Sequence, residues 1–352
     1  MSDKIKIIFS STRGWNPGDE FILIGIKNLL NSLNIDYSEI LYNRHPALRT
    51  SSSFGDRIMR NTSFLFAQKP DMQIRQHRRG KKILHFDNSF FPTNFKVADF
   101  IIFAGTPEWA GRRNSILYRY ALANRIPGAL LGVGLKNVLN RTEREYIEKY
   151  IELITTRDDE AQNQLEKFGA VRGVCPALFC SDEAKQITDV KRIGIVFQGT
   201  KVWANSISKE ILSELLPTYQ KLLEKGAEII CHHFSDFVEA MENFGESTPI
   251  LYSSNTEQVL EFYKNFDIVI GTRLHGIGAA ASSGVPGILI AHDDRTSGSG
   301  SFLETIATPD NVFDLLEKTD WIEKSKKIIA HKQKWFDIMR DLMRKTSLIE
   351  RG

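Results

Sequence analysis

The stretch "DIVIGTRLHGIGAAASSGVPGILIAHDDRTSG", residues 267–298, carries the pattern that decides the fold. Two short apolar runs, 267–271 and 287–291, predict buried β-strands. The segment between them, 275–283, consists almost wholly of Gly, Ala and Ser and has the length of a short helix. A strand, a helix and a second strand in succession are typical of a parallel sheet with crossover helices.

The same alternation runs along most of the chain and predicts an α/β fold. In the first half the predicted strands are 5–11, 38–43, 99–105, 128–135 and 153–157, and the helices are 19–33, 112–125, 142–151 and 158–168. In the second half the predicted strands are 192–198, 227–233, 249–254, 267–271 and 287–291, and the helices are 208–225, 235–244, 256–265, 275–283 and 320–346.

The rhythm breaks near 175–190, so we place a domain boundary there. We expect two tandem Rossmann-like domains, residues 1–180 and 190–352, with a cleft between them and a long helix closing the second. Ligands of doubly wound sheets bind outside the carboxyl ends of the strands. The loops that follow the strands are therefore the places to search for a site.

The amino-acid composition is that of a globular protein. Of the 352 residues, 42% are hydrophobic and 25% are charged, which suits folded domains rather than a disordered chain. Three cysteines are few and are not spaced like metal ligands, as expected in a reducing compartment. The first residues read as a strand and not as a secretory signal, and no run approaches the roughly 20 apolar residues of a membrane helix. We expect a cytoplasmic protein.

A basic segment interrupts the first domain. Residues 44–82, within an insertion of about 44–98, hold ten Lys or Arg and two acids, a local balance of +8. Two interpretations stand: a solvated insertion, or an electropositive surface for anionic lipid headgroups or a polyanionic acceptor at the inner face of the membrane. No recognised nucleic-acid-binding motif accompanies the charge, so we expect no nucleic acid partner.

Arg273 and His275 are the candidate catalytic residues. The strand ends near Thr272, so both side chains lie at the start of a helix, where free N–H groups and the helix dipole favour an anion. Arginine can grip phosphate or carboxylate with two parallel bonds. A histidine beside a bound anion is favoured in its protonated form and can act as a general acid. The alternative is that Arg273 pairs with a nearby acid and His275 only caps the helix.

The motif "TRLHGIGAAASSGVPGILIAHD" resembles the signature of the polysaccharide pyruvyl transferase family. Four further stretches resemble other parts of that family and occur in the same order: "NPGDEFILIGIKNLL" (16–30), "LLGVGL" (130–135), "TTRDDEAQNQLEKFGA" (155–170) and "CPALF" (175–179). The resemblance covers roughly residues 5–295, apart from the basic insertion.

This resemblance implies a GT-B-like architecture with an acceptor side in the first domain and a donor side in the second. It implies an enzyme that transfers pyruvate from phosphoenolpyruvate, as a ketal, to a sugar of a cell-surface or exopolysaccharide precursor. The acceptor is then a saccharide, free, nucleotide-linked or lipid-linked. Arg273 would clamp the donor, and His275 would supply a proton or assist phosphate departure. No metal and no cofactor beyond the donor substrate are expected, and no oligomeric state follows.

Other predicted substrate contacts are less specific. Asn16, Gly18 and Asp19 form a turn before a helix, where they serve either as an N-cap or as a sugar or donor contact. His232 and His233 end a strand, and at most one of them faces a ligand because neighbouring residues of a strand point to opposite faces. Arg157 and Asp158 are expected to brace a turn.

Three loops depart from the family pattern. After the third strand the chain reads "AGTPEWAG", in which Gly105 is retained; Thr106, Glu108 and Trp109 reshape the loop, with Glu108 a candidate base and Trp109 a candidate sugar platform. Lys201 stands near the position of a usual Arg, and Arg295 replaces a usual Lys. These changes keep two alternatives open: a GT-B glycosyltransferase that uses a nucleotide-sugar, and a non-catalytic sugar-binding paralogue.

Overall fold

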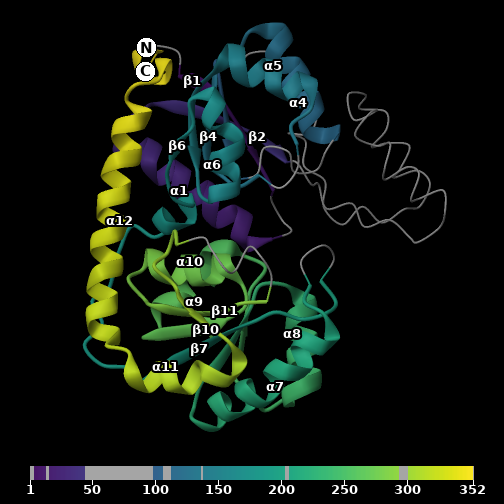
Figure 1. Cartoon of the computed structure of the whole chain (residues 1–352), viewed down its shortest axis with the longest axis vertical. Helices are drawn as coiled ribbons and strands as arrows, with labels where there is room; N and C mark the ends of the chain where they lie inside the picture. Colours follow the sequence, from purple (N-terminus) through teal and green to yellow (C-terminus); the bar gives the residue numbers. More distant parts are fainter. Residues whose placement is uncertain are drawn as a thin grey trace, which may run out of the picture. The chain divides into compact units, whose positions relative to one another are not determined.

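The computed structural model describes residues 4–12, 16–43, 98–105, 112–135, 138–202, 206–292 and 300–351. These residues form two compact units. The first comprises 1–15, 30–172 and 340–352, and the second comprises 16–29 and 173–339. Each unit holds one parallel sheet with its helices, and the two are described separately (Figure 1).

The first unit contains a six-stranded parallel sheet in the order β2-β1-β3-β4-β5-β6. Its strands are β1 (Ile5–Ser11), β2 (Tyr37–Asn43), β3 (Phe100–Ala104), β4 (Gly128–Val133), β5 (Ile151–Thr156) and β6 (Val171–Arg172). Its helices are α4 (Arg112–Asn124), α5 (Arg141–Tyr150) and α6 (Asp159–Leu165). The helix α1 (Pro17–Ser32), which follows β1 in the chain, belongs mostly to the second unit. The strands β3 and β4 are buried along their whole length, as expected where helices cover both faces of a parallel sheet.

Aromatic side chains hold α4 and α5 to this sheet. Phe103 of β3 stacks on Tyr118 of α4 with ring centroids 4.7 Å apart. Tyr146 of α5 packs edge-on against both rings, and its hydroxyl donates to the carbonyl of Ile126 at 2.9 Å. The buried phenol is therefore hydrogen-bonded, as a buried polar group must be to avoid a desolvation cost.

The second unit contains another six-stranded parallel sheet, in the order β12-β11-β10-β7-β8-β9. Its strands are β7 (Ile193–Phe197), β8 (Glu228–Cys231), β9 (Ile250–Tyr252), β10 (Ile268–Gly271), β11 (Gly287–Ile290) and β12 (Thr305–Ala307). Its helices are α7 (Lys209–Glu224), α8 (Phe234–Phe244), α9 (Thr256–Lys264), α10 (Leu274–Ser282), α11 (Val312–Lys318) and most of α12 (Trp321–Met343).

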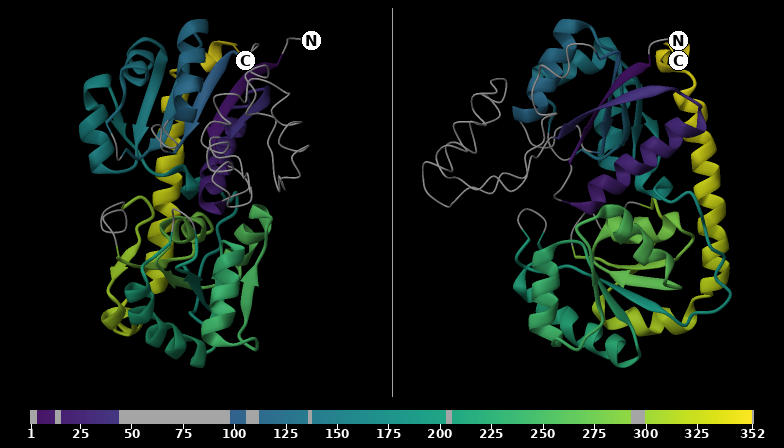
Figure 2. Two further views of the ribbon diagram at one scale, coloured as in Figure 1. Left: turned by 90° about the vertical axis from the view of Figure 1, so that its right-hand side faces the viewer. Right: turned by 180° about the vertical axis from the view of Figure 1, so that it is seen from behind.

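Alternate residues of these strands face opposite helix layers. Ile195 and Phe197 of β7 belong to a core with α7 and α11, whereas Val196 between them faces α10. The two layers lie on opposite sides of the sheet (Figure 2). A strand order that runs outward from β7 in both directions, with helices on both faces, is that of a doubly wound fold.

The predicted α/β class with two Rossmann-like sheets is confirmed. The first sheet lies within residues 5–172 and the second within 193–307. The helix predicted at 320–346 is instead α12 followed by a separate short helix, α13 (Ser347–Arg351). Three short elements, β6, β12 and α11, were not predicted.

Candidate functional site

The second sheet has its topological switch point at β7, which lies between β8 and β10. Two chain segments leave the sheet side by side there: Gln198 follows β7, and Thr272 follows β10. The Thr272 hydroxyl donates to Oε1 of Gln198 at 2.9 Å, and Nε of Arg273 donates to the carbonyl of Phe197 at 3.3 Å. The "TRLH" motif therefore lies where doubly wound sheets bind their ligands.

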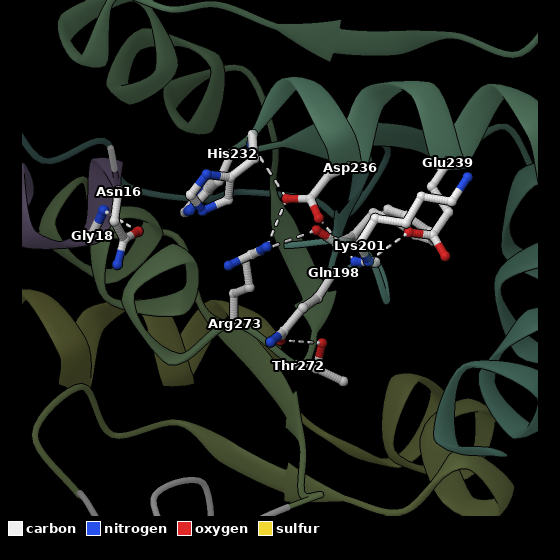
Figure 3. Close-up of polar contacts among 12 residues, drawn as sticks. Asn16, Gly18, Gln198, Lys201, His232, Asp236, Glu239, Thr272 and Arg273 are labelled. Carbon is white, nitrogen blue, oxygen red and sulfur yellow. Dashed lines mark hydrogen bonds and ion pairs between the residues drawn. The ribbon is translucent and has the colours of Figure 1, made fainter. Parts of the chain in front are cut away.

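Arg273 is the residue immediately before α10, and its guanidinium is held by a buried acid. Its backbone is extended (φ −86°, ψ 103°), and its Nη2 donates to Oδ2 of Asp236 at 2.6 Å (Figure 3). The Arg273 side chain is 3% exposed and that of Asp236 is 0% exposed. Within the described part of the chain the guanidinium makes hydrogen bonds through Nε and Nη2 and none through Nη1.

Asp236, in the first turn of α8, was not predicted as a site residue. Besides Arg273, it accepts hydrogen bonds from the backbone N–H of Gly199 at 2.9 Å and of His233 at 3.2 Å. Burial raises the pKa of Asp236 above its usual value, although Arg273 and the two N–H groups counteract this. The sequence offered one signal for this role: an acid in the first helical turn after a strand that ends at the ligand-binding edge.

Glu239, one turn further along α8, holds the loop that follows β7. Its carboxylate accepts from the N–H of Thr200 at 2.8 Å, from the Thr200 hydroxyl at 2.6 Å and from the N–H of Lys201 at 3.2 Å. The Lys201 ammonium forms an ion pair with the exposed Glu242. Lys201, which was predicted to contact the substrate, therefore has an acidic partner on α8 in this structure.

His275, in the first turn of α10, packs directly on Gly18 in α1. A Cβ added at Gly18 would lie 2.6 Å from Nδ1 and 2.8 Å from Cβ of His275, closer than real side chains approach. Only glycine fits at position 18 without moving the imidazole. The structure thus brings the "NPGDE" turn to the "RLH" motif, two segments that lie far apart in the sequence and that were each predicted to contribute to the site.

The turn before α1 is built by Asn16. Its Oδ1 accepts from the N–H of Gly18 at 3.1 Å, and its Nδ2 donates to Oδ2 of Asp19 at 3.3 Å. This is the pattern of a helix N-cap, one of the two roles predicted for these residues. The cap fixes the backbone around Gly18.

Glycines allow α10 to lie close to its neighbours. A Cβ at Gly276 would lie 2.6 Å from Cγ1 of Val196 and 2.7 Å from the Tyr263 hydroxyl. At Gly278 it would lie 2.5 Å from the ring of Phe302. The small residues of the motif therefore seat the helix tightly, which fixes the position of its first turn.

Two neighbouring histidines, His232 and His233, connect β8 to α8. His232 is buried, with its Nε2 2.5 Å from the Tyr263 hydroxyl and its ring edge-on to Phe21. Burial, with help from the charge of Arg273, lowers the pKa of His232 well below its usual value. The same two causes lower the pKa of His233 to about 3. Both rings are therefore neutral at physiological pH, and Arg273 is the charged group among them.

The remaining predicted residues lie elsewhere or are not described. Gly105 directly follows β3 in the first unit and has φ 89°, a conformation that favours glycine. Asp158 caps α6 by accepting from the N–H of Ala161 at 2.8 Å, which confirms its structural role. The following lie outside the described residues: Thr106, Glu108, Trp109, Arg295 and the basic segment 44–82.

Among the described residues no group of three or more His, Cys, Asp or Glu is arranged to hold a metal ion. None of the helices there is long and apolar enough to cross a membrane.

The protein thus has a doubly wound α/β fold. An arginine, a residue type that commonly binds anions, lies at the switch point of its second sheet. A family model described as polysaccharide pyruvyl transferase matches residues 16–294. The chain therefore belongs to the polysaccharide pyruvyl transferase family, a family of transferases, as its motifs indicated. No curated protein sequence matches the chain.

Solved structures similar to this one share its architecture. UDP-GlcNAc 2-epimerase from Neisseria meningitidis, bound to UDP-GlcNAc, has a TM-score of 0.56 and 12% identity over 98% of this chain and 100% of its own. A putative UDP-N-acetylglucosamine 2-epimerase from Listeria monocytogenes has a TM-score of 0.52 and 10% identity over 92% of this chain and 91% of its own. The glycosyltransferase SnogD from Streptomyces nogalater has a TM-score of 0.51 and 10% identity over 94% of this chain and 95% of its own. At these identities the likeness shows the fold alone, which is GT-B-like.

Proposed function

We propose that the protein transfers pyruvate from phosphoenolpyruvate to a saccharide, forming a ketal and releasing phosphate. The observation that carries this proposal is the placement of Arg273. It lies at the switch point of the second sheet, and one edge of its guanidinium is fixed by Phe197 and Asp236. The Nη1 side is not used by the described residues, so a bidentate grip on a carboxylate or phosphate needs no rearrangement.

The start of α10 would add to this grip. Its first backbone N–H groups and the positive end of its dipole favour the negative charge of the donor. The charges of Arg273 and Asp236 largely cancel, so the pair alone attracts a distant anion weakly. The start of α10 adds to the attraction for the negatively charged donor. The close seating of α10 on Val196 and Tyr263 through Gly276 keeps these groups in one place.

His275 is the proposed general acid. Protonation of the donor's methylene carbon gives a methyl group and an oxocarbenium-like centre, which a sugar hydroxyl attacks with loss of its proton. Attack by a second hydroxyl and departure of phosphate complete the ketal, so one phosphoenolpyruvate and two hydroxyls yield one ketal and one phosphate. The imidazole is held by its contact with Gly18, which supports a fixed direction of proton delivery.

The other predicted residues take supporting roles in this proposal. Asn16, Gly18 and Asp19 shape the turn beside His275, and Lys201 contributes a cation once it leaves Glu242. Gly105, Thr106, Glu108 and Trp109 are proposed for the acceptor, with Glu108 as the base and Trp109 as a stacking platform. Arg295 is proposed for the donor. The acceptor is proposed to belong to a cell-surface or exopolysaccharide precursor, and the basic segment 44–82 is proposed to contact an anionic membrane surface.

Thermal protection by candidate donors separates the proposed function from its main alternative. Phosphoenolpyruvate is titrated against UDP- and GDP-sugars, and the midpoint of thermal unfolding is followed at each concentration. The proposal expects a concentration-dependent rise with phosphoenolpyruvate that is lost in Arg273→Ala. A rise with nucleotide-sugars alone would instead support a GT-B glycosyltransferase. Protection by sugars without any donor would support a binding paralogue.

A further inference from the structure

Asp236 connects Arg273 to two other segments of the second unit. One of its oxygens accepts from Nη2 of Arg273 and from the N–H of His233, and the other accepts from the N–H of Gly199. We propose that Asp236 is a positioning residue for donor binding: it never touches the donor but fixes the plane and the rotamer of the Arg273 guanidinium. This inference rests on the proposed function and names a residue that controls its donor affinity.

The geometry explains why such a residue is needed. An arginine side chain has four rotatable torsions, and its entropy opposes any single bound pose. Here two hydrogen bonds from different atoms, Nε to Phe197 and Nη2 to Asp236, define the plane of the guanidinium. Among the described residues, neither Nη1–H group has a hydrogen-bond partner, and both share this fixed plane with the second Nη2–H. Preorganisation of this kind raises affinity, because ordering is not required when the ligand binds.

Charge compensation is the second part of the role. The Arg273 side chain is 3% exposed, so its charge is largely removed from water. A buried charge without a partner is costly, and Asp236 supplies the partner at 2.6 Å. The donor therefore meets a cation that is already desolvated and held, and it does not have to strip water from a mobile side chain.

Asp236 is itself fixed by its surroundings, as a positioning residue must be. The N–H of Gly199 comes from the loop after β7, and Glu239 on the next turn of α8 holds Thr200 and Lys201 of that same loop (Figure 3). The first turns of α8 and this loop thus form one hydrogen-bonded frame around the carboxylate. The Asp236 carboxylate lies in this frame with no exposed side-chain surface.

The test compares four variants of the full chain: Asp236→Asn, Asp236→Glu, Arg273→Lys and the double variant Asp236→Asn/Arg273→Lys. Asp314→Asn is the matched control, because it removes a carboxylate from an exposed ion pair with Lys318 in the same unit. Calorimetry gives the Kd for phosphoenolpyruvate, and phosphate release with an accepted sugar gives kcat and the KM of each substrate. Circular dichroism checks the fold.

We expect Asp236→Asn to weaken phosphoenolpyruvate binding by about 10- to 100-fold, since a misplaced binding group costs up to about two orders of magnitude. The KM for the sugar should stay near that of the parent, a split that general destabilisation would not produce. The double variant should bind the donor no more weakly than Arg273→Lys alone, because Asp236 acts through Arg273. Asp314→Asn should match the parent.

Several results would overturn the inference. A folded Asp236→Asn with the parent Kd would do so, as would a double variant in which the two losses simply multiply. If Asp236→Asn does not fold, Asp236→Glu decides: it keeps the charge but is one methylene longer, and an unchanged donor Kd would refute the positioning role. If the parent protein binds no phosphoenolpyruvate, the proposed function itself is refuted. If the parent and all the variants bind it with the same Kd, only this inference is refuted.

Discussion

Gly18→Ala is the substitution that tests the contact between α1 and His275. The added Cβ would lie 2.6 Å from Nδ1, 2.8 Å from Cβ and 3.0 Å from Cγ of His275. The imidazole end can rotate away, but the Cβ of His275 is fixed to the backbone of α10. Relief of the clash therefore requires a shift of one helix against the other, within a unit whose α10 is already seated tightly by Gly276 and Gly278.

The expected loss of stability in Gly18→Ala is that of an overpacked core. Forcing extra atoms into a packed site destabilises by about 1–3 kcal/mol. In a unit of this size each kcal/mol lowers the unfolding midpoint by roughly 2–4 °C, so a fall of several degrees is expected. The displaced imidazole should also lower the rate of transfer by up to about 100-fold.

The assay is a double-mutant cycle with His275→Gly, which removes all three contacting atoms. In that background Gly18→Ala should be neutral or stabilising by up to about 1 kcal/mol, because the clash is gone and position 18 lies in the first turn of a helix, where alanine is favoured over glycine. A coupling energy of at least about 1 kcal/mol between the two positions is therefore predicted. Equal destabilisation by Gly18→Ala in both backgrounds would refute the assigned contact.

Two other predictions concern the titration of His233 and the basic segment. The pKa of His233 is about 3 in the folded protein against an ordinary 6.5, so the unfolded chain binds the proton more readily, and stability falls as the pH drops through this interval. Denaturant titrations should show that His233→Asn removes about 2 kcal/mol of the stability loss between pH 7 and about pH 5, and an unchanged pH dependence would contradict the neutral imidazole. Reversing several charges within residues 44–82 should weaken sedimentation with anionic vesicles in a salt-sensitive way, and parent binding that is absent or indifferent to salt would exclude the membrane surface.

Much of the fold was predictable because its central strands, such as β3, β4, β10 and β11, are buried on both faces. The run "DIVIG" is apolar at nearly every position, and the structure places β10 at Ile268–Gly271, one residue from the predicted start. By contrast, β12 has three residues, two of which are only partly buried or exposed, and its pattern is no different from that of a loop. It is a strand because the edge of β11 offers backbone partners.

The candidate site was predictable in part, for a physical reason. Arg273 and His275 lie on one short motif, so their proximity to a helix start follows from local sequence. The partner of Arg273 does not: Asp236 lies 37 residues earlier, and the pairing depends on β8 and β10 flanking β7 in the sheet. The contact between Gly18 and His275 likewise spans most of the chain and comes from tertiary packing.

The buried ion pair changes how Arg273 should be understood. From the sequence alone, an anion clamp and a partner of a nearby acid are alternative roles for this residue. The structure contains the acid, and the contact uses one edge of a group that has five N–H donors. An ion pair on one edge and a ligand on the other are compatible. The two roles are therefore combined in the function proposed above.

The most direct test of this account is phosphate release from phosphoenolpyruvate in the presence of a panel of sugars, with the ketal product identified by mass spectrometry. The parent should release phosphate and form ketal in equal amounts with at least one sugar. Arg273→Ala and His275→Ala should form neither product while remaining folded. Activity near the parent level in both variants, or phosphate release without any ketal, would contradict the assignment.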